Sequence, residues 1–188
     1  VNPRVYVGVT GWTGSGGTGT SVRTTQAGTA VPFGTFFRRT FTATSSVARL
    51  TYVNATSGVY GIHVVAGKTY SVAMFVRSSI ALSSATIQVT NGTVYDITNI
   101  PVQANSWTRI SGKLTATVTG NARIALTVPS SVASTTPASW YYDVTGVSFV
   151  EGDLPDQQFF DGNMIGYSFT GAADASTSIT TVSGGIKE

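Results

Sequence analysis

The chain has 188 residues, of which 41% are hydrophobic and 10% charged, so it is apolar enough to build one core and too apolar to be disordered throughout. Its net charge of +3 arises from 11 basic and 8 acidic residues that are scattered along the chain, unlike the concentrated basic patch of a nucleic-acid-binding protein. The chain has no cysteine, which excludes disulfides and thiol-based metal sites, and no apolar run of the roughly 20 residues that a membrane helix needs.

Short β-like segments separated by Gly, Ser, Asn and Pro run along the chain, and no stretch shows the apolar stripe of a helix. In chain order, the expected strands cover residues 5–10, 20–26, 35–44, 48–54, 59–64, 68–79, 85–90, 93–98, 107–118, 121–128 and 140–150. Strands at this spacing, broken by turn residues rather than helices, are typical of β-sandwiches and jelly rolls. We therefore predict an all-β jelly-roll sandwich.

Two early features define how the first half of the sandwich is expected to fold. The glycine-rich stretch 14–19 is expected to be a flexible turn, because it lacks the Gly-Lys-Ser/Thr ending of a phosphate-binding loop. In the segment 68–79, alternate residues form a wholly apolar face, which predicts a central strand. The residues of this face are Tyr70, Val72, Met74 and Val76.

The second half contains a hairpin signal and two further amphipathic strands. Asn91-Gly92 predicts a two-residue type I′ turn, because both residues tolerate positive φ. A loop is expected over 101–106, after which segment 107–118 alternates between an apolar and a polar face. Its inward residues are expected to be Ile110, Leu114, Ala116 and Val118, and those of the next strand Ile124, Leu126 and Val128.

Five short motifs occur in a characteristic order over residues 1–152. They are Asn2-Pro3, Gly11-Trp12, Val65 to Val72 followed by Val76-Arg77, Trp107 to Gly112, and Tyr142-Asp143-Val144 followed by Glu151-Gly152. In this order they resemble the xylanase-type carbohydrate-binding modules, which are jelly-roll sandwiches of the galactose-binding-like type. The resemblance implies a non-catalytic fold that binds glycans.

The C-terminal part carries a second resemblance. Residues 155–162 read Pro-Asp-Gln-Gln-Phe-Phe-Asp-Gly, and Gly166 to Gly171 follows shortly after. This segment resembles one that follows sandwich domains in minor tail proteins of phages infecting actinobacteria, although Phe169 stands where a Trp is common. The resemblance implies a location in the virion, outside the cell, with other phage tail proteins as partners and a homo-oligomer as one option.

These resemblances divide the chain into two parts. Residues 1–152 are expected to form the sandwich, and residues 153–188 a C-terminal extension that ends in a linker around Ser183-Gly184-Gly185. The sequence begins at Val1 rather than at a Met, which predicts a module processed or cut from a longer polypeptide.

Aromatic side chains are the candidates for glycan binding, because a sugar ring offers an apolar C–H face to an exposed Trp or Tyr. The candidates are Trp12, Tyr60, Tyr95, Trp107 and Trp140. Each of them could pack in the core instead, and for Trp107 that interpretation is favoured because large aromatics are usually buried. Alternation sends Trp140 and Tyr141 to opposite faces, so at most one of the two can contact a ligand.

One cofactor follows from the resemblance to carbohydrate-binding modules. In many of them a calcium ion ties the first strand to the last, and Asp143 matches one of its ligands. Calcium takes six to eight oxygens and generally more than one carboxylate, whereas no acidic residue follows Asn2-Pro3 here. A structural calcium at Asp143 is therefore an open alternative, and no other cofactor is expected.

Catalytic motifs are missing from the sequence. His63 lies in a strand-like run without a nearby acid, and neither a Gly-x-Ser-x-Gly elbow nor a His-Glu-x-x-His pair occurs. Two carboxylates alone can hydrolyse a glycoside, but four of the seven acids considered lie in 151–174, which looks like an extension and not a cleft. We predict a non-catalytic protein.

Two functions remain open at this stage. The first is a structural module of a phage tail that adheres to host-surface glycans, without nucleic-acid binding or membrane insertion. The alternative is a carbohydrate-binding module of a secreted bacterial polysaccharide hydrolase.

Overall fold

A computed structural model describes residues 12–15, 18–25, 35–42, 48–52, 62–128, 139–153, 167–169 and 178–180. Within these ranges every regular element is a β-strand, and no helix is long and apolar enough to cross a bilayer. The strands are β1 Trp12–Ser15, β2 Gly19–Thr25, β3 Thr35–Phe41, β4 Ala48–Tyr52, β5 Ile62–Val64, β6 Thr69–Ser78, β7 Leu82–Thr90, β8 Val94–Val102, β9 Thr108–Thr115, β10 Gly120–Val128, β11 Trp140–Glu151, β12 Tyr167–Phe169 and β13 Ser178–Thr180.

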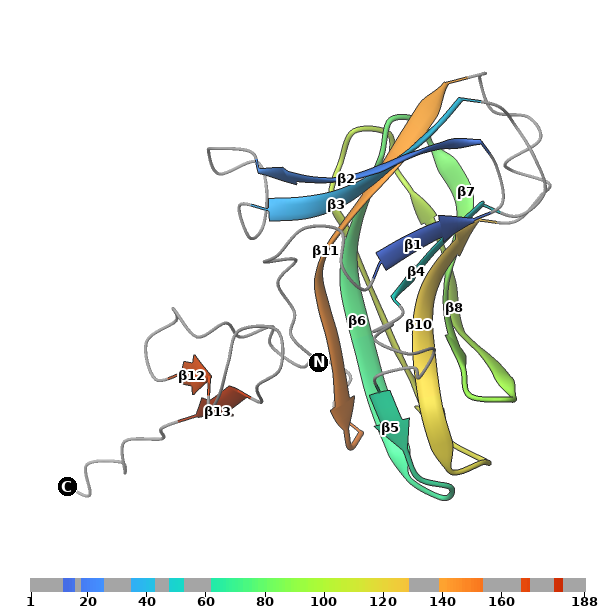
Figure 1. The fold of residues 1–188 in the computed structure, drawn as a ribbon, viewed down its shortest axis with the longest axis vertical. Coiled ribbons are helices and arrows are strands. Elements are labelled where there is room, and N and C mark those ends of the chain that lie inside the picture. The colour runs from blue at the N-terminus through green and yellow to red at the C-terminus, as the bar shows by residue number, and fades with distance from the viewer. Residues whose placement is uncertain are drawn as a thin grey trace.

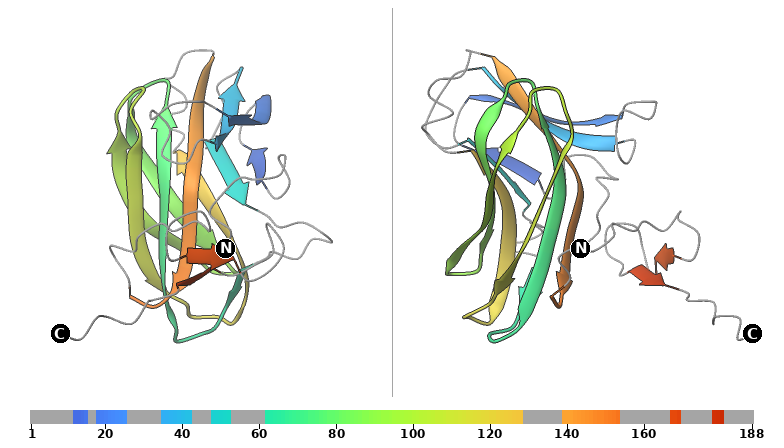
Figure 2. Two further views of the ribbon diagram at one scale, coloured as in Figure 1. Left: turned by 90° about the vertical axis from the view of Figure 1, so that its left-hand side faces the viewer. Right: turned by 180° about the vertical axis from the view of Figure 1, so that it is seen from behind.

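The strands form two antiparallel sheets that face each other (Figures 1 and 2). One sheet has the order β1-β4-β10-β7-β8, with β5 paired to β10, and the other has the order β2-β3-β11-β6-β9. We call the second the five-stranded sheet. The short strands β12 and β13 pair only with each other. The predicted all-β sandwich is confirmed.

The core lies between the two sheets, and the alternation of β6 shows how the sequence builds it. Tyr70, Val72, Met74 and Val76 are at most 3% exposed, as expected for the apolar face of that strand. Because β6 pairs with β11 on one side and β9 on the other, it is also the interior strand that the pattern predicted. The inward residues predicted for β10, Ile124, Leu126 and Val128, are fully buried in the same cluster.

The hairpin between β7 and β8 is confirmed, but its predicted turn type is wrong. Thr90 pairs with Val94, so three residues connect the strands, and only Gly92 among them has positive φ, at 98°. A type I′ turn needs positive φ at two successive residues. Asn91 instead donates from Nδ2 to the carbonyl of Val118 at 2.7 Å, which ties this hairpin to the neighbouring β9–β10 turn. Val118, expected inside, is 43% exposed there.

The glycine-rich stretch is also more ordered than expected. Gly14 belongs to β1 and Gly19 to β2, so the prediction of a flexible turn is wrong for both. The side chain of Arg39, which is only 7% exposed, lies against Gly14, where a Cβ on Gly14 would overlap it. The Nη1 of Arg39 donates to the carbonyl of Gly19 at 3.1 Å. Gly14 therefore makes room for a buried guanidinium, and Gly19 allows the close approach of the backbone of Thr40 in β3.

Two further predictions concern the sheet edge and the part of the chain outside the described ranges. Strand β8 continues through Pro101 to Val102, where a loop was expected. A proline is tolerated there because β8 lies at the edge of its sheet, where one side of the strand has no neighbour that needs its N–H groups. The strand predicted at 5–10 and most of the extension 153–188 lie outside the described residues.

Candidate functional site

A row of side chains crosses the outer face of the five-stranded sheet, the face that points away from the core. Strand register places Val22 beside Arg38, Arg38 beside Asp143, and Asp143 beside Arg77. The pairing of Val76 with Thr108 brings Trp107 to the other side of Arg77. Alternation turns Arg38, Asp143 and Arg77 outward because their chain neighbours fill the core, namely Phe37, Tyr142, Val144 and Val76.

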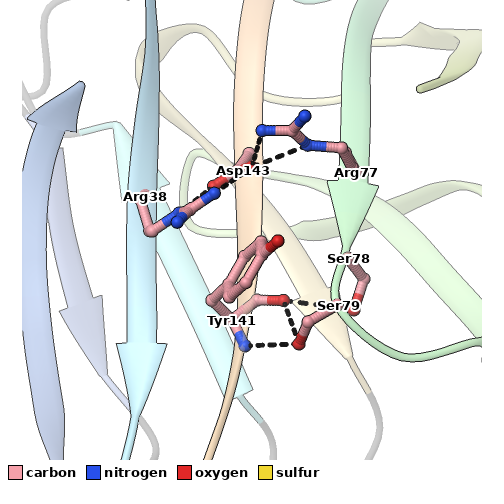
Figure 3. Close-up of polar contacts among 6 residues, drawn as sticks. All are labelled: Arg38, Arg77, Ser78, Ser79, Tyr141 and Asp143. Carbon is pink, nitrogen blue, oxygen red and sulfur yellow. Dashed lines mark hydrogen bonds and ion pairs between the residues drawn. The ribbon is translucent and has the colours of Figure 1, made fainter. Parts of the chain in front are cut away.

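Asp143 holds two arginines at the middle of this row (Figure 3). Arg38 donates from Nε to Oδ1 at 2.7 Å and from Nη2 to Oδ2 at 2.9 Å. Arg77 donates to Oδ2 from Nε at 2.9 Å and from Nη2 at 2.7 Å. The side chain of Asp143 is fully buried, whereas those of Arg38 and Arg77 keep 26% and 12% of their surface exposed. Hydrogen bonding to Asp143 raises the pKa of Arg38, although burial of the guanidinium lowers it in part.

Aromatic rings support both guanidinium groups. Arg38 lies 3.6 Å from the ring centroid of Tyr141, and Arg77 lies 4.8 Å from that of Trp107. Phe36 lies beneath them, 5.2 Å from each guanidinium and 5.9 Å edge-on from the ring of Trp107. Such cation–π contacts fix both the rings and the charges in place.

The backbone of Tyr141 is anchored by the end of β6 (Figure 3). Ser79 donates its N–H to the carbonyl of Tyr141 at 3.0 Å, and the N–H of Tyr141 donates to Ser79 Oγ at 3.0 Å. Ser78 Oγ donates to the same carbonyl at 3.2 Å. The ring therefore stands on a backbone that is bonded at both of its polar groups.

This arrangement offers flat apolar rings beside guanidinium donors, and both are partly exposed. Trp107 and Tyr141 are each half-buried, so part of each ring reaches solvent. A sugar presents a C–H face and a rim of hydroxyls, which these two kinds of group complement. Within the described ranges no group of three or more His, Asp or Glu side chains could hold a metal ion, and the exposed His63 lies 3.4 Å from the amide oxygen of Asn121.

The same architecture occurs in known carbohydrate-binding proteins. No protein-family model matches the chain, and no curated protein sequence does. Among solved structures, the CBM22-1 xylan-binding domain of Paenibacillus barcinonensis Xyn10C superposes with a TM-score of 0.53 at 12% identity, covering 75% of this chain and 85% of that one. The CBM22-1–GH10 modules of Clostridium thermocellum xylanase 10B give 0.57 at 16% identity, covering 86% and 29%. The enzymatically active domain of bacteriophage CBA120 tailspike protein 4 gives 0.50 at 14% identity, covering 77% and 20%.

The chain has the jelly-roll fold of carbohydrate-binding modules. The predicted jelly roll is thus confirmed. At identities of 12 to 16% the likeness extends to the fold and not to the ligand.

Trp140 lies in the core and not on a ligand-binding face. It is 3% exposed and stacks on Phe41, with ring centroids 4.5 Å apart and an interplanar angle of 17°. Of the pair that alternation separates, the outward residue is Tyr141. The reason is that Trp140 occupies the side of β11 that faces the other sheet, so its ring has no open face for a sugar.

The other four candidates have different positions. Trp107 belongs to the row, although the guanidinium of Arg77 already covers part of its ring. Tyr95 packs against the core, and its hydroxyl bonds to the Thr117 N–H and Oγ1 at 2.8 Å, so it ties β8 to the β9–β10 turn. Trp12 begins β1, but its side chain is outside the described part of the chain, as is Tyr60 altogether.

Asp143 does not fit a calcium site. Both of its carboxylate oxygens accept hydrogen bonds from guanidinium groups, and a divalent cation there would have to displace or sit beside two positive charges. Calcium also needs further oxygen ligands. The carboxylate is instead the centre of an ion-pair network.

Sequence reasoning missed Tyr141, Arg38, Arg77 and Phe36 as members of one site. The one available signal was strand alternation, which places Tyr141 on the other face of its strand from Trp140 and Arg38 on the other face from Arg39. Which strands lie side by side is not encoded in local alternation, so the row could not be assembled before the sheet order was known.

Proposed function

We propose that this protein is a non-catalytic module of a phage tail that adheres to host-surface glycans through the outer face of its five-stranded sheet. The observation that carries the proposal is the row in which Tyr141 and Trp107 flank the network of Arg38, Asp143 and Arg77. It combines partly exposed rings with fixed hydrogen-bond donors on interior strands.

A binding role fits this row better than catalysis. Hydrolysis of a glycoside uses two carboxyl groups, one of which donates a proton. The row contains one carboxylate, and both of its oxygens accept hydrogen bonds from arginines. With both oxygens occupied by guanidinium groups, Asp143 is poorly suited to act as acid, base or nucleophile.

The phage setting is supported by the motifs around Phe159 to Gly171 and by the likeness to the tailspike domain at a TM-score of 0.50. Its partners would be other tail proteins, host glycans and further copies of the chain, in a virion outside the cell. Neither nucleic acid nor membrane insertion is part of the proposal.

A carbohydrate-binding module of a secreted bacterial polysaccharide hydrolase is the second candidate. The two xylanase-module structures, with TM-scores of 0.53 and 0.57, favour it. The parent open reading frame separates the two candidates, because a neighbouring hydrolase domain supports the second. A stable oligomer in light scattering supports the first.

A glycan array with the full chain tests the binding role. Tyr141→Ala is expected to lower binding by about tenfold, as is typical when a central aromatic is removed from an interface. Val94→Ala is the control, because Val94 is 55% exposed and lies on the other sheet. If the wild-type chain binds no host-envelope or plant glycan, the proposed function is wrong.

A further inference from the structure

The central row carries more positive than negative charge. Arg38 and Arg77 share a single carboxylate, and no other acidic side chain in the described ranges is paired with either of them. The acids at the far end of β11 have other partners, because Glu151 binds Lys68 and Asp153 binds Lys113. One positive charge therefore remains uncompensated at the centre of the outer face.

The unused donors of the two arginines have a defined position. Asp143 occupies Nε and Nη2 of each guanidinium, and neither Nη1 group donates to this carboxylate. Figure 3 shows the third nitrogen of Arg77 pointing away from the carboxylate. The side chains of Arg38 and Arg77 keep 26% and 12% of their surface exposed. Two N–H donors on each Nη1 group are thus open to a ligand, and charged donors bind anionic acceptors about twice as strongly as neutral ones.

The donors are also held rigid before a ligand arrives. Arg38 rests on Tyr141 and Arg77 on Trp107, and both contact Phe36. A free arginine loses rotamer entropy when it binds, whereas these two have already lost it on folding. A further positive charge, Arg109, lies on the same face across from Phe75, and its Nη1 donates to Ser111 Oγ at 3.1 Å.

We infer that this row binds negatively charged sugars, carrying a carboxylate or a phosphate, in preference to neutral ones. The inference rests on the proposed glycan-binding function and adds the ligand class to it. The acidic group accepts hydrogen bonds from the Nη1 groups of Arg38 and Arg77, and the sugar ring lies against the exposed part of Tyr141 or Trp107.

Calorimetric titration of the full chain with two matched pairs of sugars tests this. The pairs are trigalacturonate with galactotriose, and glucose 6-phosphate with glucose. An acidic member that binds about tenfold or more tightly than its neutral counterpart supports the inference and identifies the acidic group; the affinity should fall as salt rises, because salt screens the charges. Equal affinities within both pairs overturn the inference and leave the proposed function standing. Failure of every glycan on the array overturns both.

Two variants locate the effect at the row. Arg38→Gln removes the excess charge while Arg77 still pairs with Asp143, so the preference for the acidic sugar should fall to within about twofold of the neutral one. Lys113→Gln is the matched control, because Lys113 carries the same charge on the same face but is paired with Asp153 and 58% exposed. If Arg38→Gln fails to fold, Arg38→Lys and the salt dependence of the wild type decide instead. A preference that survives Arg38→Gln, or that Lys113→Gln abolishes, overturns the inference.

Discussion

Two adjacent aromatic residues of β11 should respond to mutation in opposite ways. Trp140 is 3% exposed and stacks on Phe41, whereas Tyr141 is half-buried under Arg38 on the outer face. Replacement of a buried Trp by Ala removes about 3–5 kcal/mol from the free energy of unfolding. For a chain of this size about 2–4 °C of Tm corresponds to each kcal/mol, so Trp140→Ala should lower Tm by ~6–20 °C.

Tyr141→Ala should have a much smaller effect on stability. Its main loss is the contact with Arg38, and an exposed cation–π pair contributes about 0.5–1 kcal/mol. Glycan binding should show the reverse order: Tyr141→Ala weakens it by about tenfold, and Trp140→Phe, which keeps an aromatic ring in the core, leaves it unchanged. Urea unfolding followed by far-UV circular dichroism measures the first effect, and calorimetric titration the second.

An inverted order of the two effects would contradict the positions of the two rings. Should Trp140→Ala lose less than about 1 kcal/mol of stability while abolishing glycan binding, the ring cannot be the core residue described above. A stability loss above about 3 kcal/mol for Tyr141→Ala would equally show that its ring is a core element and not part of a binding face.

Three further predictions concern packing, pH and metal. Gly112→Ala should lower the free energy of unfolding by about 1–3 kcal/mol, because the new Cβ would meet Ile97 Cγ2 at 2.5 Å. Gly120→Ala is the control and should be neutral or stabilising in the same urea titration, because the space around Gly120 is open. Equal effects of the two substitutions would contradict the close approach of the sheets. Burial raises the pKa of Tyr142 well above its usual value of 10, so the unfolded state ionises first and the free energy of unfolding should fall as pH rises past ~10. Tyr142→Phe should reduce that fall, and it should add about 1 kcal/mol at neutral pH because it removes a buried hydroxyl without a partner. An unchanged alkaline decline in the variant would refute this. Excess calcium or EDTA should change Tm by less than ~1 °C, since the oxygens of Asp143 are bound by arginines, and a larger chelator effect would restore the metal site.

Local patterns in the sequence were sufficient for most of the strands of the sandwich, whereas β1, β12 and β13 were not predicted. The alternation of Tyr70, Val72, Met74 and Val76 specifies both the strand and its buried face, because side chains of a strand point to opposite sides in turn. Turn residues such as Gly92 mark where strands end. Fold class follows from these two signals together, without any long-range information.

Contacts between distant segments explain what could not be predicted. Arg38 and Asp143 are 105 residues apart, so their pairing depends on β3 and β11 being neighbours in the sheet. The type of the Asn91 turn was misjudged for the same reason, because its amide is used by the neighbouring β9–β10 turn. Which of Trp140 and Tyr141 faces inward depends on where the second sheet lies.

Asp143 explains why two arginines and several aromatic rings can share one small surface. Without a carboxylate between them, the guanidinium groups of Arg38 and Arg77 would repel each other and turn toward water. With it, both lie flat on rings, which leaves less ring surface for a neutral sugar and concentrates one excess charge at the centre of the sheet. Selectivity on this face therefore comes from charge more than from stacking. Asp143→Asn should therefore release the arginines from the rings and weaken the preference for acidic over neutral sugars in titrations of a variant whose circular dichroism remains native, whereas a stronger preference would show that the carboxylate offsets their charge more than it orients them.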